Sequence, residues 1–408
     1  MMNNIKVSVV MPVYNAEPFL RDTLDDVRNQ TLKEIEIICV DDGSSDGSLQ
    51  LLKEIAAEDD RITVIHQENA YAGAARNNGM SHASGEYIIF WDSDDIFHEN
   101  ALEHMYNKIR ETDSDLCLCA SNQYDMLTDK IYDSNACIRH EFIPDTVPFN
   151  KYDIPNTIFN ITNNVPWNKL FKKSFIDKHE LRFQDIRQAN DTYFSMMALF
   201  LAEKITYIDE VLVTYRVSNS LSISGKASKT TLCGYESYVY TLERLQKYED
   251  FPLVKKSFQN RCISGLYHSL NIQTSFDSYC ILFNKIKNEG IDLFGFADMA
   301  QEDFVVGWYY TDLTMMQSMK DADFLMYKTN KRRIGSDRIK NRFKKLQGED
   351  KQLKQTIKEL KAEKKDLQKA LKKSNNRIEE LETSFSYKLG RTLTTPVRLV
   401  RDRGADTK

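Results

Sequence analysis

Residues 7–42 read VSVVMPVYNAEPFLRDTLDDVRNQTLKEIEIICVDD, and the fold prediction starts from this stretch. A short run rich in β-branched residues comes first, an amphipathic helical pattern follows, and a second apolar run closes the unit. The alternation continues to Phe90, with further apolar runs at RITVIHQ (61–67) and EYIIFW (86–91). Strands that alternate with helices in this way predict an α/β fold, a parallel sheet covered by helices on both faces.

The residues that follow each predicted strand are the candidates for function. Ligands of such sheets bind beyond the carboxyl ends of the strands. The four strands end in PVYN, DDGSSDG, QENAYAGAARNNG and DSDD, respectively. Polar, glycine-rich and acidic residues are therefore expected to converge on one edge of the sheet.

The amino-acid composition limits which kinds of protein this chain can be. The chain has 408 residues, of which 41% are hydrophobic and 28% charged, which is enough for more than one domain. Its net charge of -5 gives no general attraction for nucleic acid or for an anionic membrane. The seven cysteines include no CxxC pair, which predicts a reducing cytoplasm without a disulfide framework or a zinc site. We find no signal peptide and no uninterrupted apolar run of about 18 residues, so we expect no secretion signal and no membrane span.

The sequence patterns divide the chain into five expected segments. Two halves of one mixed α/β domain come first, and an aromatic-rich helical domain, a coiled coil and a basic tail follow. Their expected boundaries are 1–105, 106–224, 225–335, 336–385 and 386–408, respectively.

A heptad pattern predicts the coiled coil. Leucines recur at seven-residue spacing, and Ser374 takes the one remaining place; they are Leu346, Leu353, Leu360, Leu367 and Leu381. This column predicts a coiled coil that makes dimers or trimers. A single solvated charged helix is the alternative.

The last residues form a basic tail, with six basic side chains against two acidic ones between residues 386 and 408. Its apolar residues Leu389, Leu393, Val397 and Val400 would share one helical face, a pattern typical of a helix on an anionic membrane surface. Pro396 disfavours a helix, so a frayed tail is the alternative.

The stretch FWDSDDIF (90–97) places three carboxylates at the end of a predicted strand. Asp92 and Asp94 are two residues apart, so their side chains can point to the same side. Hard oxygen ligands suit Mg²⁺ or Mn²⁺, and such an ion would neutralise a diphosphate. Unpaired carboxylates would repel one another and raise their pKa values, so the cluster favours a bound cation.

The other strand ends supply the context that a DxD pair needs. Pro12 rigidifies the first turn, and Tyr14 offers a flat ring on which a base could stack. Asp41 or Asp42 can accept hydrogen bonds from a uracil-type ring or from ribose hydroxyls, while Gly43 permits a tight turn.

Structural alternatives exist for two of these motifs. DDGSSDG could be an ordinary turn with a helix cap at Ser45 or Asp46. An EF-hand is excluded, because Lys53 stands where the loop needs its bidentate Glu. Arg76 could reach a phosphate or could form a surface ion pair.

Four motifs in this order and spacing resemble the family 2 glycosyltransferases of the GT-A fold: VSVVMPVYNAEPFLRDTLDDVRNQT, IEIICVDDGSSDGS, NAYAGAARNNG and GEYIIFWDSDD. The resemblance covers the first hundred residues strongly and runs more loosely to about Ser224. It implies a GT-A fold, a nucleotide-sugar donor that is commonly UDP-linked, a divalent Mn²⁺ or Mg²⁺, and inversion at the anomeric carbon. The implied acceptor is a glycan or a lipid-linked molecule in bacterial surface-polysaccharide synthesis.

The resemblance also assigns residues. It implies that Asp41 contacts the base, Arg76 lies near the phosphates, Asp92 lies near the ribose or donor sugar, and Asp94 binds the metal. The full implied donor-binding set is Pro12, Val13, Tyr14, Asp41, Asp42, Arg76, Asp92 and Ser93.

Inversion in one displacement needs a general base opposite the leaving diphosphate. In similar enzymes a Glu-Asp pair opens the helix after the acceptor region, and here the pair reads Asn190-Asp191. Asp191 is therefore the implied base; the alternative is an acid favoured by the helix dipole. The stretches WNKLFKKSF and TYRVSNSLSIS also look familial, so Trp167, Lys169, Asn190, Tyr215 and Arg216 are candidates for the acceptor or diphosphate side. Trp167 fits the core equally well, and no histidine is assigned to catalysis.

Two hypotheses from different classes follow. The first is a metal-dependent inverting glycosyltransferase in the cytoplasm, peripheral on the inner face of the cell membrane. The second is a catalytically inactive, transferase-like scaffold that oligomerises through its coiled coil, and Asn190 in place of Glu counts slightly for it. A Rossmann dehydrogenase is disfavoured, because no GxGxxG follows the first strand.

Overall fold

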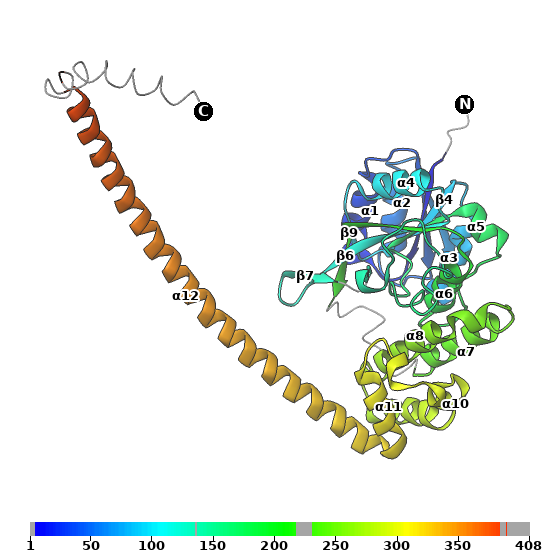
Figure 1. The fold of residues 1–408 in the computed structure, drawn as a ribbon. Coiled ribbons are helices and arrows are strands. Elements are labelled where there is room, and N and C mark those ends of the chain that lie inside the picture. Colours follow the sequence, from blue (N-terminus) through cyan, green and yellow to red (C-terminus); the bar gives the residue numbers. More distant parts are fainter. Residues whose placement is uncertain (1–4, 135–136, 218–230, 384–388, 390–408) are drawn as a thin grey trace, which may run out of the picture. The chain divides into compact units, whose positions relative to one another are not determined.

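The structure is a computed structural model that describes residues 5–134, 137–217, 231–383 and 389 (Figure 1). For residues 335–350 and 382 it describes the backbone alone. The chain forms two compact units, residues 1–324 and 325–408.

The first ninety residues form the predicted alternation of strands and helices. The elements are β1 (Val7–Val13), α1 (Glu17–Arg28), β2 (Ile35–Asp42), α2 (Ser48–Ala56), β3 (Ile62–Gln67), α3 (Tyr71–His82) and β4 (Tyr87–Phe90). In α1, Leu20, Leu24 and Val27 are buried at helical spacing, and Pro18 stands in the first turn, where no backbone N–H is needed.

The second half of the α/β domain adds the remaining strands. Its elements are β5 (Ile96–Phe97), α4 (Ala101–Glu111), β6 (Leu116–Asp125), β7 (Lys130–Ser134), η1 (His140–Phe142), β8 (Lys169–Lys172), α5 (Lys173–Lys178), α6 (Asp191–Leu201) and β9 (Ile205–Val217). The strand order in the nine-stranded sheet is β3-β2-β1-β4-β8-β6-β9-β5, with β7 paired to β6. β1 is parallel to β2 and β4, whereas β8 is antiparallel to β4 and β6, so the sheet is mixed. The predicted GT-A-type α/β fold is confirmed.

Helices cover both faces of the sheet. Side chains of α1, α2 and α4 pack with Val7, Val9 and Met11 of β1 in one core. On the opposite face α3 approaches the sheet closely, since a Cβ on Gly79 would lie 2.5 Å from Cγ1 of Val10. The same periodicity of two that predicted the strand therefore separates the two cores.

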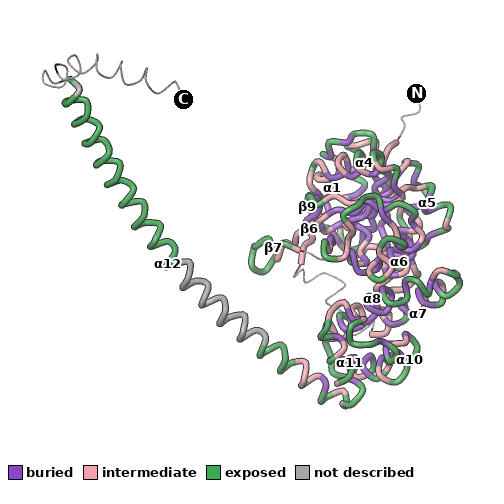
Figure 2. The backbone as a smooth tube through the Cα atoms, in the orientation of Figure 1, coloured by how far each residue is buried: buried purple, intermediate pink, exposed green. Residues whose placement is uncertain are grey.

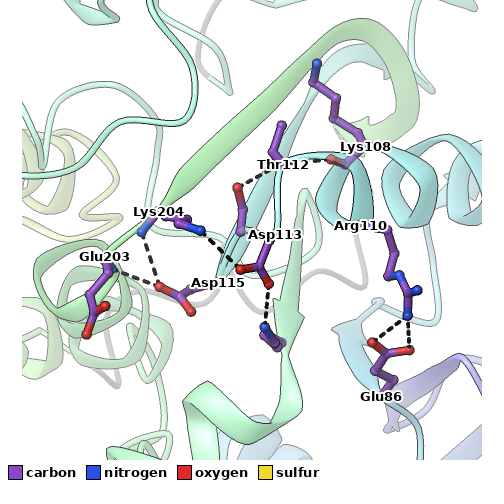
Figure 3. Close-up of polar contacts among 10 residues, drawn as sticks. Glu86, Lys108, Arg110, Thr112, Asp113, Asp115, Glu203 and Lys204 are labelled. Atoms are coloured by element: carbon purple, nitrogen blue, oxygen red, sulfur yellow. Dashed lines mark hydrogen bonds and ion pairs between the residues drawn. The ribbon is translucent and has the colours of Figure 1, made fainter.

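Acidic side chains join three strands at the edge opposite to the carboxyl ends of β1, β2 and β4, and Figure 3 shows their contacts. Asp113 accepts hydrogen bonds from Lys172 Nζ at 3.0 Å and from Lys204 Nζ at 3.1 Å. Asp115 accepts from the backbone N–H groups of Glu203 at 2.9 Å and Lys204 at 3.2 Å. These contacts tie the start of β6 to the end of β8 and the start of β9.

The helical region belongs to the same compact unit as the sheet. Its helices are α7 (Cys233–Leu245), α8 (Phe251–Asn271), α9 (Phe276–Lys285), α10 (Ile291–Leu293) and α11 (Trp308–Ser318), with a π-helical turn η3 (Ile286–Gly290) and the 3-10 turns η4 (Phe296–Asp298) and η5 (Gln301–Asp303) between them. Buried hydrogen bonds connect it to the α/β domain: Ser257 Oγ accepts from the Phe159 N–H at 2.8 Å and donates to Asn160 Oδ1 at 3.0 Å.

Helix α12 (Asp321–Thr383) runs without interruption for 63 residues. Residues 351–381 are exposed, and Figure 2 colours this stretch accordingly. The predicted leucine column is thus a surface feature, with Leu353 61%, Leu360 57% and Leu367 65% exposed. The coiled coil stays a prediction, and the predicted basic tail lies outside the described residues except for Leu389. No described helix combines the length and apolar character that a membrane span requires.

Candidate active site

The carboxyl ends of β1, β2 and β4 carry the predicted site residues. Pro12 and Val13 are buried at the end of β1, and Tyr14 follows them with 46% of its surface exposed. Asn15 adopts a left-handed φ of 50°, and its Oδ1 accepts the Ser45 N–H at 2.8 Å. The segments that follow β1 and β2 are therefore held together next to Tyr14 in the chain.

Asp41 is the buried carboxylate at the end of β2. Its Oδ2 lies 2.7 Å from His66 Nδ1 and accepts the Ser44 N–H at 3.4 Å. Its Oδ1 is buried and has no hydrogen-bond partner among the described residues. A buried acceptor without a donor costs free energy, so this oxygen is suited to a ligand N–H such as that of a uracil ring.

His66 is a site residue that the sequence reasoning missed. In the parallel register between β2 and β3, His66 is the direct partner of Asp41. Its side chain is 55% exposed, so it covers Asp41 from the solvent side. The sequence contained a signal for this contact. If IEIICVDD and RITVIHQ are aligned as neighbouring parallel strands in this register, Asp41 and His66 stand side by side.

The carboxylate of Asp42, which was predicted to contact the substrate, already forms hydrogen bonds within the protein. Its Oδ1 accepts from Gln67 Nε2 and from the Ala70 N–H, both at 2.8 Å. Its carbonyl oxygen accepts from Asn69 Nδ2 at 3.0 Å. Gly43 follows with φ of 71°, a conformation that favours glycine. Asp42 therefore anchors the turn that leads into α3.

Arg76 links the loop after β4 to the residue that precedes α6. It projects from α3 and is only 6% exposed. One end of the guanidinium donates to Asp92 Oδ1 at 2.6 Å, and the other donates to Asn190 Oδ1 at 3.0 Å. Its Nε is buried without a described partner, and its plane lies over the Phe183 ring. The alternative of a surface ion pair is excluded by this burial.

The hydrogen bond from Arg76 explains an amide at position 190, because the Asn190 side chain accepts from Arg76 without adding a charge.

The close approach of α3 to the loop before α6 also depends on Gly73. A Cβ on Gly73 would lie 2.3 Å from the Gln184 carbonyl oxygen and 2.9 Å from Cβ of Asn190. Only a residue without a side chain lets α3 contact this loop so closely.

The loop after β4 is fixed by Arg216. The guanidinium of Arg216 donates to the Asp94 carbonyl oxygen at 2.8 Å, and its backbone N–H donates to Asp95 Oδ1 at 3.0 Å. Thr23 Oγ1 donates to the Asp95 carbonyl oxygen at 2.9 Å. Arg216 thus belongs to the site through the acidic loop, where sequence reasoning expected it on the acceptor or diphosphate side.

The three carboxylates of the loop have different environments. Asp92 and Asp94 are partly exposed, whereas Ser93 is buried between them. Asp95 is fully buried, and burial, followed by the charges of Asp94 and Asp92, raises its pKa well above the ordinary range. Asp95 therefore favours its neutral form and anchors the backbone of Arg216.

The donor set fits a divalent cation that takes part of its ligands from a substrate. Within the described ranges, no three His, Cys, Asp or Glu side chains are grouped closely enough to hold a metal alone. Mg²⁺ commonly uses one or two carboxylates together with substrate phosphates and water. The carboxylates of the partly exposed residues Asp92 and Asp94 match that chemistry, and the metal role of Asp94 stays a prediction.

Asp191 occupies the first position of α6, as the sequence predicted. Its side chain is partly exposed and pairs with no other side chain in the described part of the chain. Burial by its surroundings raises its pKa, and the charge of Asp92 adds to this effect, while Arg76 and Lys169 oppose it. A carboxylate with a raised pKa is a stronger base, which suits proton abstraction.

Three further candidates lie behind this surface. Trp167 is buried and stacks on Tyr215, with ring centroids 5.7 Å apart. Lys169 has no exposed surface, and its Nζ donates to the Val165 carbonyl oxygen at 2.6 Å and to Asn168 Oδ1 at 2.7 Å. The geometry gives Trp167 a core position, and Lys169 holds the segment 162–168 through these hydrogen bonds.

Comparison with known proteins identifies the class. The sequence model of glycosyl transferase family 2 matches residues 8–180. EpsH of Bacillus subtilis (strain 168) is 34% identical over 257 residues, which span 61% of this chain and 73% of EpsH. The glycosyltransferase GlyG of Streptococcus pneumoniae serotype 4 is 34% identical over 216 residues, 52% of this chain and 70% of GlyG.

The solved structure of residues 1–349 of S. aureus TarS covers 71% of this chain and 89% of TarS 1–349, with 18% identity and a TM-score of 0.46. The assignment rests on the family match and on the two sequence relatives. The chain belongs to glycosyltransferase family 2 and is a glycosyltransferase.

Proposed function

We propose that the enzyme transfers a sugar from a UDP-linked donor to a hydroxyl of a glycan or lipid-linked acceptor in surface-polysaccharide synthesis, with metal assistance and inversion. The observation that carries the proposal is Arg76, which joins Asp92 on the donor side to Asn190, the neighbour of Asp191. One buried guanidinium thereby couples the two halves of a transfer site.

The base end of the donor has a matching surface. The exposed Tyr14 ring offers a stacking face, and the unpartnered Oδ1 of Asp41 offers an acceptor for the ring N–H of uracil. His66 holds the other oxygen of Asp41 and so fixes the direction of the free one. Family membership supports a nucleotide-sugar at this edge of the sheet.

Asp94, with Asp92 beside it, would hold Mn²⁺ or Mg²⁺. The ion would supply electrostatic stabilisation of the departing nucleotide diphosphate. Arg76 pairs with Asp92 and adds a fixed positive charge there. Arg216 keeps the loop in position through the Asp94 carbonyl oxygen.

Asp191 would accept the proton of the acceptor hydroxyl. Its raised pKa favours proton uptake, and the Arg76–Asn190 hydrogen bond holds the start of its helix. In a single displacement the hydroxyl attacks as its proton passes to Asp191, and the anomeric configuration inverts.

The test is a screen of UDP-sugars for Mn²⁺-dependent turnover with the variants Asp94→Ala and Asp191→Asn. We expect each to lower turnover by at least about a hundredfold. Asp185→Asn is the matched control, because Asp185 is an exposed carboxylate on the loop before α6. Near-normal turnover in either variant would remove that residue's role. Absence of any thermal stabilisation by millimolar UDP with Mn²⁺ would favour the inactive scaffold instead.

A second copy of this chain is the partner we propose for α12. A hollow in its surface is lined by Leu360, Glu363, Lys364, Leu367, Gln368 and Leu371. In the predicted heptad, Leu360 and Leu367 are d positions, and Lys364 and Leu371 are a positions. Glu363 at g and Gln368 at e flank them. Together the six residues outline two overlapping holes of the kind that receive side chains of a facing helix. Lys364 at an a position of one copy would lie near Glu363 at g of the other, which pairs opposite charges.

The oligomeric state of the full chain tests this proposal. We expect a dimer or trimer by light scattering, and a monomer for Leu360→Glu combined with Leu367→Glu. Asn376→Glu is the control, because residue 376 lies at an f position on the far side of the seam. A monomeric wild-type chain would overturn the proposal. Contact of the basic tail with a membrane stays a prediction.

A further inference from the structure

Two arginines lie near each other beside the segment that contacts α6, and neither forms an ion pair with a carboxylate in the described part of the chain. Arg139 follows β7, Arg261 belongs to α8, and both are half-buried. Burial lowers the pKa of Arg139, and the nearby charge of Arg261 lowers it further, against weaker opposing effects of Tyr309 and then the exposed Glu141. Two half-buried cations that repel each other cost free energy unless an anion joins them.

One short segment, residues 161–165, connects both arginines to the catalytic helix. The Arg139 backbone N–H donates to the Ile161 carbonyl oxygen at 2.9 Å. Arg261 Nε donates to Asn164 Oδ1 at 3.0 Å, and Asn164 Nδ2 lies 3.4 Å from Thr192 Oγ1. Thr192 directly follows Asp191, so a single residue separates Arg261 from the first turn of α6.

The same segment is supported from behind by a third cation. Lys169 Nζ donates to the Asn163 carbonyl oxygen at 2.9 Å. Burial lowers the pKa of Lys169 to about 7; the charge of Arg261 lowers it further, while those of Cys137, Asp191 and Cys119 oppose. Burial and then Arg261 also lower the pKa of His268 on α8. The neighbourhood therefore disfavours additional positive charge, and the carboxylate of Asp191 lies close enough to act on Lys169.

We propose that Arg139 and Arg261 bind a phosphate group of the acceptor substrate. A guanidinium presents a planar fork of donors that matches phosphate oxygens, and Arg261 uses only its Nε in a described hydrogen bond. The donor diphosphate has its own partner in Arg76 on the other side of Asn190. A phosphate between α8 and the segment 161–165 would place a hydroxyl of the same molecule near Asp191. This inference rests on the proposed function.

The probe is inorganic phosphate, titrated into the full chain by calorimetry at constant ionic strength with UDP and Mg²⁺ in excess. We expect saturable binding by the wild type and at least a tenfold weaker affinity in Arg139→Gln and in Arg261→Gln. Arg182→Gln is the matched control, since Arg182 is exposed and, among the described residues, its side chain donates to the Leu181 carbonyl oxygen alone. Unchanged affinity in Arg139→Gln, or no saturable binding by the wild type, would overturn the inference.

Thermal unfolding separates ligand binding from a structural role. Removing one of two like charges should leave Arg139→Gln melting at or above the wild-type temperature without phosphate, because no described hydrogen bond of the side chain is lost. The phosphate-induced rise in melting temperature should vanish in the same variant. A variant that melts well below the wild type while keeping the phosphate-induced rise would show a structural arginine and overturn the inference.

Two competitors identify the source of the phosphate. Displacement of inorganic phosphate by a polyprenyl diphosphate in detergent micelles would indicate a lipid-linked acceptor, and displacement by glycerophosphoglycerol would indicate a phosphodiester polymer. Displacement by neither would overturn the assignment to an acceptor. Hydrolysis of UDP-sugars by the wild type without acceptor tests the proposed function separately, so the two failures are distinguishable.

Discussion

Substitution of Gly73 by Ala should impair catalysis far more than stability. The new Cβ would lie 2.3 Å from the Gln184 carbonyl oxygen and 2.9 Å from Cβ of Asn190. Favourable contacts lie at about 3.5–4.0 Å, so the loop before α6 must move by about 1 Å. That movement strains the 3.0 Å hydrogen bond between Arg76 and Asn190 and shifts Asp191 with it.

Magnitudes decide which effect of Gly73→Ala dominates. Overpacking costs about 1–3 kcal/mol in free energy of unfolding. A better helix former returns about 1 kcal/mol, because Gly73 lies inside α3. A misplacement of about 1 Å in a transfer site, in contrast, can lower the rate by about a hundredfold. We therefore expect a folded protein with a small loss of stability and a large loss of turnover.

The assay is the initial rate of UDP release from the donor sugar, measured together with urea unfolding. Gly307→Ala is the matched control, because a Cβ there meets nothing within 4 Å. It should keep wild-type turnover. A Gly73→Ala enzyme with wild-type turnover and stability would show that the contact between α3 and the 184–190 loop does not position the site.

Three further predictions follow from individual side chains. Burial raises the pKa of Asp95 in the folded state, so the contribution of Asp95 to stability is present below the unfolded pKa of about 3.9 and is lost as pH rises through the folded pKa. Asp95→Asn should therefore flatten this part of the pH–stability curve measured by urea unfolding. An unchanged curve would contradict a buried neutral Asp95. Hydrogen bonds from Lys172 and then Lys204 lower the pKa of Asp113, so the contribution of Asp113 to stability is present at neutral pH and is lost as pH falls through the folded pKa. Asp113→Asn should lower the free energy of unfolding only slightly, and less still at high salt, because these ion pairs are exposed and Asn tolerates the φ of 46° at this position. His66→Ala should raise the KM for the donor by about tenfold with a smaller change in kcat, because one lost charge-assisted hydrogen bond is worth about 1.5–3 kcal/mol at most; an equal fall in kcat alone would place His66 in the chemical step.

The local pattern of the sequence was sufficient for the architecture of the first half. Alternating apolar runs and helical stripes predicted β1 to β4 and α1 to α3, because these elements bury residues at fixed periods of two and 3.6. The same reasoning placed the acidic loop at a strand end, and the family resemblance placed Asp191 at a helix start, both as observed. The leucine column of α12 was equally visible, since a heptad repeat is a local property.

Tertiary structure alone decided which of these residues meet. Arg76 contacts Asn190 across 114 positions of sequence, and no local period encodes that contact. His66 became part of the site only through its parallel register with Asp41. The burial of Lys169 and of Asp95 likewise depends on strands from the second half of the domain. Periodicity determines the face on which a side chain lies, whereas long-range packing determines what lies opposite, and at this site the opposite partner sets the charge, the pKa and the accessible atoms of each group.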